Sequence, residues 1–130
     1  MKIIILGGGS IGSSVAKELS SEENDVVVID NNKKNLEALE PIEGIKTICG
    51  NGSSPKTLSQ SGLDNDSLFL CLTDSEETNL LASIVGKHKY NAGRIVCRLK
   101  GSEYRNSSEA SEPSSEASEL SSEASELSSE

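Results

Sequence analysis

The sequence predicts an α/β domain with a doubly wound parallel sheet, followed by a low-complexity tail. Three observations predict it. Apolar runs rich in β-branched residues alternate with stretches of helical period, a glycine-rich loop follows the first run, and the composition changes abruptly near residue 106. We therefore expect one domain over residues 1–105 and a separate tail over residues 106–130.

Five short apolar runs, each bounded by Gly, Asn or Pro, predict strands. They cover residues 2–6, 26–30, 45–49, 67–72 and 94–99. The stretches between them predict helices over residues 10–21, 33–40, 54–61 and 76–89. Right-handed crossovers would give the strand order 3-2-1-4-5, with a ligand crevice at the carboxyl ends of the strands. The loops after the first four strands should converge on that crevice.

The loop after the first strand has the sequence Gly-Gly-Gly-Ser-Ile-Gly and fits the pattern G-x-G-x-x-G. In a Rossmann-like domain the first glycine permits a tight turn, the second lets the backbone approach a pyrophosphate, and the third lets the helix pack close to the sheet. The helix that follows would present free N–H groups and a partial positive charge to the phosphates. A purely structural glycine turn is the alternative. The candidate ligand residues of this loop are Gly7, Gly9, Ser10, Ile11 and Gly12.

Asp30 ends the second predicted strand, 18 residues after Gly12, where an acid commonly binds an adenosine ribose. Its carboxylate would accept hydrogen bonds from the ribose hydroxyls and repel a 2′-phosphate. NAD(H) is therefore favoured over NADP(H), and ADP or ATP remain possible because they share the ribose. The alternative role for Asp30 is that of a helix-capping acid in a turn.

The charge distribution excludes nucleic acid as a partner. The formal net charge is -9, but all 12 Lys and Arg lie within residues 1–105 together with 14 of the 21 acidic residues, so this part is nearly neutral. It offers no basic stripe and few aromatic side chains with which to hold a nucleic-acid backbone. Its first apolar run is too short for a signal peptide or a membrane span, which predicts a cytoplasmic protein.

The residues that most often carry catalysis or bind metals are sparse. The three cysteines form no C-x-x-C pair, and we expect all three to be small buried side chains in a reducing compartment. The alternative for Cys71 or Cys97 is a redox switch, which requires a lowered thiol pKa. His88, the one histidine, is expected near a helix end in solvent. The sequence therefore predicts no metal site, no catalytic residue and no enzyme.

The tail repeats seven residues of Ser, Glu and Ala, closed once by Pro and twice by Leu. Its few apolar residues would bury too little surface to offset the loss of backbone entropy, about 1 to 2 kcal/mol per residue. A disordered or frayed helical tail is therefore expected. A docked helix is the alternative, with a seam of Ala117, Leu120, Ala124 and Leu127.

Residues 1–104 also resemble the RCK (TrkA-N) family of bacterial potassium-uptake regulators. Besides the glycine loop and Asp30, the resemblance rests on residues 24–25, 50–53, 73–79, 98–100 and 102–104, of which the block Thr-Asp-Ser-Glu-Glu-Thr-Asn at 73–79 is the most specific. It implies that residues 51–53 lie beside the adenine and that residues 73–74 lie nearer the phosphates and the second ribose. The ligand residues that it adds are Asn51, Gly52, Ser53, Thr73 and Asp74.

Three of these residues have structural alternatives. Thr73 and Asp74 could cap the helix that starts near Glu76, and Asn51 could serve a turn. Many relatives carry Asp in place of Asn51, and some ATP-responsive relatives carry Arg in place of Ser10, which favours NAD(H) here. Arg98 and Lys100 are expected to be solvated surface charges, outside the site.

The resemblance further implies a regulatory NAD(H)-binding subunit of a Trk-type potassium uptake system. Such a subunit senses nucleotide and controls a TrkH-like membrane potassium transporter or channel. Members of the family form homo-oligomeric rings at the cytosolic face of the inner membrane. The chain lacks the helices and second lobe that follow in the family, so ring assembly by this segment alone is not expected. The alternative function is an NAD-dependent oxidoreductase, or a fragment of one, with the same glycine loop and acid.

Overall fold

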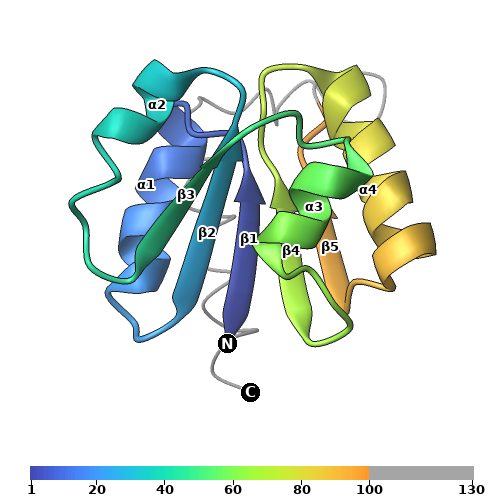
Figure 1. Ribbon diagram of the computed structural model, residues 1–130, viewed down its shortest axis with the longest axis horizontal. Helices are drawn as coiled ribbons and strands as arrows, with labels where there is room; N and C mark the ends of the chain where they lie inside the picture. The colour runs from blue at the N-terminus through green and yellow to red at the C-terminus, as the bar shows by residue number, and fades with distance from the viewer. Residues whose placement is uncertain (100–130) are drawn as a thin grey trace, which may run out of the picture.

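The computed structural model describes residues 1–99, which form a five-stranded parallel sheet with helices on both faces (Figure 1). The strand order is β3-β2-β1-β4-β5, which confirms the predicted doubly wound topology. The predicted tail over 106–130, Lys100 and residues 102–104 lie outside the described residues. In chain order the elements are β1 (Lys2–Leu6), α1 (Ser10–Ser20), β2 (Asp25–Asp30), α2 (Lys33–Glu37), β3 (Ile45–Cys49), α3 (Pro55–Ser61), β4 (Ser67–Cys71), α4 (Glu76–Tyr90) and β5 (Arg94–Cys97).

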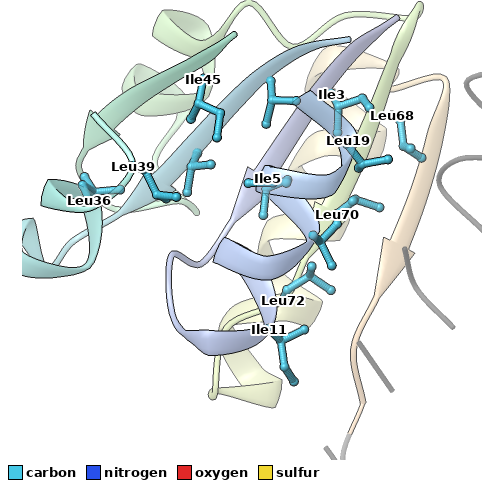
Figure 2. Packing of buried hydrophobic residues seen from close by; sticks show 14 residues of the cluster. Ile3, Ile5, Ile11, Leu19, Leu36, Leu39, Ile45, Leu68, Leu70 and Leu72 are labelled. Carbon is cyan, nitrogen blue, oxygen red and sulfur yellow. The ribbon is translucent and has the colours of Figure 1, made fainter. Parts of the chain in front are cut away.

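The central strand β1 divides the core into two halves. Ile3 and Ile5 pack against α1 and α2, and Ile4 and Leu6 pack against α3 and α4, because successive side chains of a strand point to opposite faces. Figure 2 shows the first of these halves, in which Leu19 of α1 covers the sheet. Burial on both faces explains why the strand sequences are continuous apolar runs rather than alternating ones. The sheet is thus a rigid support for the loops at its carboxyl edge.

Two predicted elements are shorter in the structure by more than one residue. The helix expected over 33–40 ends at Glu37, and Leu39 and Ile42 then donate hydrogen bonds to carbonyl groups three residues earlier. Pro41 accounts for this ending, since the residue before a proline is biased away from helical backbone angles. Strand β5 ends at Cys97 rather than Leu99, which leaves Arg98 on a loop at the carboxyl edge.

Helix α4 ends at Asn91, a cap residue in the left-handed region with φ of 50°. Ala92 N–H closes the turn onto the carbonyl of Gly86 at 3.1 Å, which is a common way for a helix to stop. The outer side of α4 exposes Leu80, Leu81 and Ile84. Within residues 1–99, no helix combines the length and the apolar composition needed to cross a lipid bilayer.

Candidate functional site

A cleft of about 730 Å³ opens at the carboxyl edge of the sheet. It lies between the loops that follow β1, β2, β3, β4 and β5, which is where ligands bind in doubly wound sheets. The predicted convergence of the strand-end loops is therefore confirmed. The residues from these loops that line it include Gly7, Gly9, Ser10, Ile11, Asp30, Asn51, Gly52, Ser53, Thr73 and Asp74.

Those ten residues are all of the predicted ligand residues except Gly12, which does not line the cleft. Gly12 is buried in the first turn of α1, and a Cβ added there would lie 1.8 Å from the carbonyl oxygen of Gly7. Its place in the pattern is therefore explained by close packing of α1 against the end of β1. Contact of the other ten residues with a ligand stays a prediction.

The remaining glycines of the loop have separate roles. Gly7 has φ of +112°, a conformation that other residues rarely adopt, and its N–H donates to Ile29 O at 2.7 Å. A Cβ added to Gly9 would meet no atom of residues 1–99 within 4 Å, so this side of the loop is open in the described part of the chain. Gly9 is also the N-cap of α1 and supplies no side-chain cap. The N–H groups of Ser10 and Ile11, in the first turn, are therefore positioned to receive an anion at the cleft.

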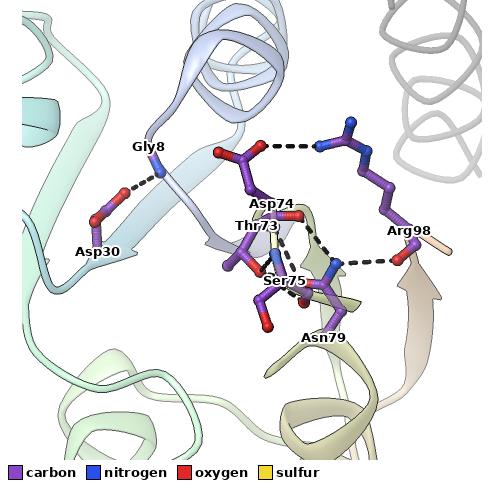
Figure 3. Close-up of polar contacts among 7 residues, drawn as sticks. All are labelled: Gly8, Asp30, Thr73, Asp74, Ser75, Asn79 and Arg98. Carbon is purple, nitrogen blue, oxygen red and sulfur yellow. Dashed lines mark hydrogen bonds and ion pairs between the residues drawn. The ribbon is translucent and has the colours of Figure 1, made fainter. Parts of the chain in front are cut away.

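Asp30 connects the glycine loop to the start of α2. Its Oδ2 accepts a hydrogen bond from Gly8 N at 2.7 Å (Figure 3). The same oxygen accepts one from Asn35 Nδ2 at 3.1 Å, and Oδ1 accepts one from Asn32 N at 2.8 Å. A carboxylate has about four acceptor sites, so capacity remains for a ligand hydroxyl. The N-cap of α2 is Asn32, whose side chain accepts from Lys34 N. The alternative role of Asp30 as the capping residue of this helix is therefore wrong.

The loop after β3 is held by its own side chains. Asn51 Oδ1 accepts from Ser53 N at 3.0 Å and from Ser53 Oγ at 2.8 Å, so the carbonyl end of this side chain does serve a turn. A Cβ added to Gly52 would lie 1.9 Å from Leu6 Cδ1, so the loop passes directly over the end of β1. This close approach gives one wall of the cleft its position.

The loop after β4 is held by Asn79 from the first turns of α4 (Figure 3). Asn79 Oδ1 accepts from Thr73 N at 3.0 Å and Thr73 Oγ1 at 2.7 Å, and Asn79 Nδ2 donates to Thr73 O at 3.1 Å and Arg98 O at 3.0 Å. The Asn79 residue is only 1% exposed. The N-cap of α4 is Ser75, whose hydroxyl accepts from Thr78 N, so neither Thr73 nor Asp74 is the capping residue.

Arg98 was expected to be a solvated surface charge, and the structure shows otherwise. Its side chain is 14% exposed, lines the cleft and lies 3.5 Å from Asp74 Oδ1 through Nη1. Asn79 was missed as well, because a polar residue near a helix start usually faces solvent. A positional signal was available for Arg98, since it directly follows a strand whose carboxyl end meets the same edge as the others. Asn35, Ser75 and Thr78 also line the cleft and were not predicted.

The cysteines differ from the expectation that all three are buried. Cys71 is buried, Cys97 is half-buried, and Cys49 is exposed on the edge strand β3. Burial raises the pKa of the Cys71 thiol above its ordinary value, and burial is also the main cause of the raised pKa of Cys97. A redox switch needs a lowered thiol pKa, so these shifts oppose that role.

Thiol labelling checks this assignment. In the native protein at neutral pH, we expect Cys49 to react with a disulfide reagent well before the other two cysteines, which are less accessible and whose thiol pKa is raised by burial. Because the pKa of Cys97 is raised, its labelling should accelerate as the pH rises into the alkaline range. The Cys49→Ser variant is the control, and fast labelling of that variant at neutral pH would contradict the assignment.

Within the described part of the chain, no three His, Cys, Asp or Glu side chains are placed to hold a metal ion. The described residues that line the cleft supply backbone groups, amides, hydroxyls and three charged side chains, Asp30, Asp74 and Arg98, beside a few apolar side chains. These groups suit a polar ligand with hydroxyls and negative charge.

Comparison with known families decides the relationship of the chain. The family model described as the TrkA-N domain matches residues 3–112. The chain belongs to the TrkA-N domain family. Among the relatives of this TrkA-N domain, the Trk system potassium uptake protein TrkA of Haemophilus influenzae is 36% identical over 104 residues, which are 80% of this chain and 23% of that protein. A TrkA homolog of Methanothermobacter thermautotrophicus is 32% identical over 82% of this chain and 49% of its own length. The TrkA-N chain thus spans about a quarter to a half of these relatives.

Solved structures agree on the fold of this TrkA-N domain. A structure described as the Shewanella denitrificans Kef CTD in AMP bound form superposes with a TM-score of 0.65, at 21% identity, over 79% of this chain and 62% of that one. ChuY, described as an anaerobilin reductase from Escherichia coli O157:H7, gives a TM-score of 0.58 at 12% identity, over 73% of this chain and 48% of its own. Both support a Rossmann-like fold.

Proposed function

We propose that this domain binds NAD(H) and is a regulatory part of a Trk-type potassium uptake system. The observation that carries the proposal is the cleft in which the open glycine loop, the start of α1 and the carboxylate of Asp30 face one space. Membership of the TrkA-N family supplies the link to potassium uptake.

The residues of the cleft fit a dinucleotide. No atom of residues 1–99 would contact a Cβ placed on Gly9, and the first turn of α1 supplies N–H donors for a pyrophosphate. Asp30 would accept a ribose hydroxyl through its remaining lone pair while it holds Gly8 in place. The cleft volume lies within the range of about 300 to 1,000 Å³ that is typical of small-molecule sites. The adenine would lie beside the loop of residues 51–53.

The charges in the cleft favour NAD(H) over NADP(H). A 2′-phosphate near Asp30 would need a cation, and the two nearest in sequence, Lys33 and Lys34, are exposed and do not line the cleft. ADP and ATP share the adenosine ribose, and ATP represents them as the competing ligand in the test below. The bound nucleotide would control a membrane potassium transporter subunit by favouring one conformation of an assembled regulator, at the cytosolic face of the membrane.

A regulatory role is favoured over catalysis by the residues at the site. The one histidine, His88, is exposed in the last turn of α4 and does not line the cleft. Among residues 1–99, the ionisable side chains that line it are Asp30, Asp74 and Arg98, and all three are engaged with protein partners. A sensor needs binding alone, and these groups supply it.

Calorimetric titration tests the proposal. We expect the protein to bind NADH and NAD more tightly than NADPH or ATP, and we expect Asp30→Asn to weaken NADH binding roughly tenfold to a hundredfold, since charged hydrogen bonds are worth about 1.5 to 3 kcal/mol. Asp25→Asn is the matched control, because Asp25 is an exposed acid at the opposite end of the same strand. Equal affinities of Asp30→Asn and the unmodified protein would refute the ribose contact.

Two further outcomes concern the proposal as a whole. Failure of all four nucleotides to bind would refute nucleotide sensing by this domain. Turnover of NADH with a carbonyl substrate, observed as loss of its absorbance, would favour the oxidoreductase alternative instead.

A further inference from the structure

Arg98 and Asp74 form an ion pair whose two partners have opposite surroundings. The Arg98 side chain is 14% exposed and lines the cleft, whereas the Asp74 side chain is 99% exposed, with Oδ1 at 3.5 Å from Nη1 (Figure 3). Among residues 1–99, Arg98 is also the one basic residue that lines the cleft. An anionic ligand would therefore meet a guanidinium that already has a carboxylate beside it.

The backbones that carry the pair are fixed, so that only the side chains need to move. Arg98 N donates to Cys71 O at 3.0 Å, and Asn79 Nδ2 bridges Arg98 O and Thr73 O. Asp74 follows Thr73 directly, and its loop is closed by the bond from Ser75 N to Thr73 Oγ1 at 3.1 Å. The ends of β4 and β5 are thereby held together, with the pair at the rim of the cleft.

The difference in exposure between Asp74 and Arg98 favours replacement of Asp74 by an anionic ligand as the partner of Arg98. Asp74 is almost fully hydrated, so its carboxylate loses little when it leaves the guanidinium, and exposed ion pairs contribute little to stability. Arg98 is mostly desolvated and gains more from an anion that reaches it inside the cleft. A phosphate offers several oxygen atoms to the planar guanidinium and can bind it through two hydrogen bonds.

We infer that Arg98 is a phosphate-binding residue of the cleft and that Asp74 is its internal competitor, which a nucleotide phosphate displaces. The inference rests on the proposed nucleotide-binding function. It makes the pair a determinant of affinity for nucleoside diphosphates and dinucleotides, without effect on the uncharged nucleoside.

The test compares Asp74→Asn, Arg98→Gln and the double variant, each titrated with NADH, ADP and adenosine. Asp74→Asn should bind NADH and ADP about twofold to fivefold more tightly, the size expected for release of an exposed ion pair. Arg98→Gln should bind them roughly tenfold to a hundredfold more weakly, since it loses a charged hydrogen bond. Neither substitution should change the affinity for adenosine. Asp25→Asn, remote from the cleft, controls for the change in net charge.

The double variant separates competition from simple repulsion. If Asp74 acts by occupying Arg98, Asp74→Asn gives no tightening in the Arg98→Gln background. If Asp74 only repels phosphate, the tightening persists in that background, and the competition is refuted. Binding of NADH by Arg98→Gln at the affinity of the unmodified protein would overturn this inference alone. No binding of NADH or ADP by the unmodified protein would overturn the proposed function, and this inference with it.

Discussion

Gly12→Ala is expected to destabilise the domain by about 3 kcal/mol, at the upper end of the cost of overpacking. The added Cβ would lie 1.8 Å from the carbonyl oxygen of Gly7 and 2.9 Å from its carbon. Both are backbone atoms at the end of β1, so no side-chain rotation can relieve the contact. The helix must shift away from the sheet, which opens the packing around Val15 and Ile5. Urea denaturation followed by circular dichroism measures the change in unfolding free energy.

Gly9→Ala is the matched control, since it makes the same chemical change three residues earlier. Gly9 has φ of -70°, which alanine adopts freely, and no atom lies within 4 Å of the added Cβ. We expect its stability to change by less than about 1 kcal/mol. Its affinity for NADH should fall, because the new methyl group occupies space that the pyrophosphate is proposed to fill. Equal denaturation midpoints for the two variants would contradict these separate roles of the glycines.

The fold could be predicted from sequence because the strand signals, the helix signals and the turn signals all indicate the same alternation of strands and helices. The apolar runs are short and β-branched, the stretches between them have helical period, and glycines mark the sharp turns. The errors lie at element ends, where local hydrogen bonds decide. The turn after Glu37 is one example, in which Leu39 N donates to Leu36 O rather than continuing an α-helix. Cys49 is another, since it is the last residue of the edge strand β3 and stays exposed there.

The sequence predicted those residues of the candidate site whose place in the cleft follows from their position in a loop at the end of a strand. The glycine loop and Asp30 follow from spacing, and residues 51–53 and 73–74 from the family resemblance. Arg98 and Asn79 could not be placed in this way, because their roles depend on contacts between segments. In the sequence, Arg98 cannot be distinguished from the many cationic residues that lie on protein surfaces. Its 14% exposure and its partner Asp74 become known only from the structure. Asn79 acquires its role only when Thr73 and Arg98 are brought to either side of it.

Asp30 shows that binding and folding share groups in this domain. Its carboxylate orients Gly8 and the start of α2 through Asn32 and Asn35, so the proposed ribose acid also shapes the phosphate loop. Substitution by Asn retains an acceptor for one of these bonds, whereas Ala removes all of them. For this reason Asp30→Asn tests ligand contact more cleanly than Asp30→Ala.

Asn79→Ala is expected to destabilise the domain by about 2 to 4 kcal/mol. The substitution leaves several buried polar groups without a hydrogen-bond partner, and each such group costs about 1 to 3 kcal/mol of stability. The lost partners serve Thr73 N, Thr73 O and Arg98 O, and Asn79 itself is 1% exposed. Asn65→Ala makes the same chemical change at an exposed position and should alter stability by no more than about 0.5 kcal/mol. Thermal and urea denaturation of both variants measure the difference.

The Asn79→Ala variant should also bind NADH more weakly under conditions where it is still folded. Asn79 is not a lining residue of the cleft, so it acts only by holding the loops of Thr73 and Arg98 in register. Asn79→Asp provides the contrast: its carboxylate keeps the acceptor for Thr73 N and Thr73 Oγ1 but cannot donate to Thr73 O or Arg98 O. Weakened NADH binding in both variants, with adenosine affinity unchanged, would show that the Nδ2 donor, which joins Thr73 O and Arg98 O, positions the phosphate end of the site. Full NADH affinity in Asn79→Asp would instead assign the role to the Oδ1 acceptor and the Thr73 loop alone.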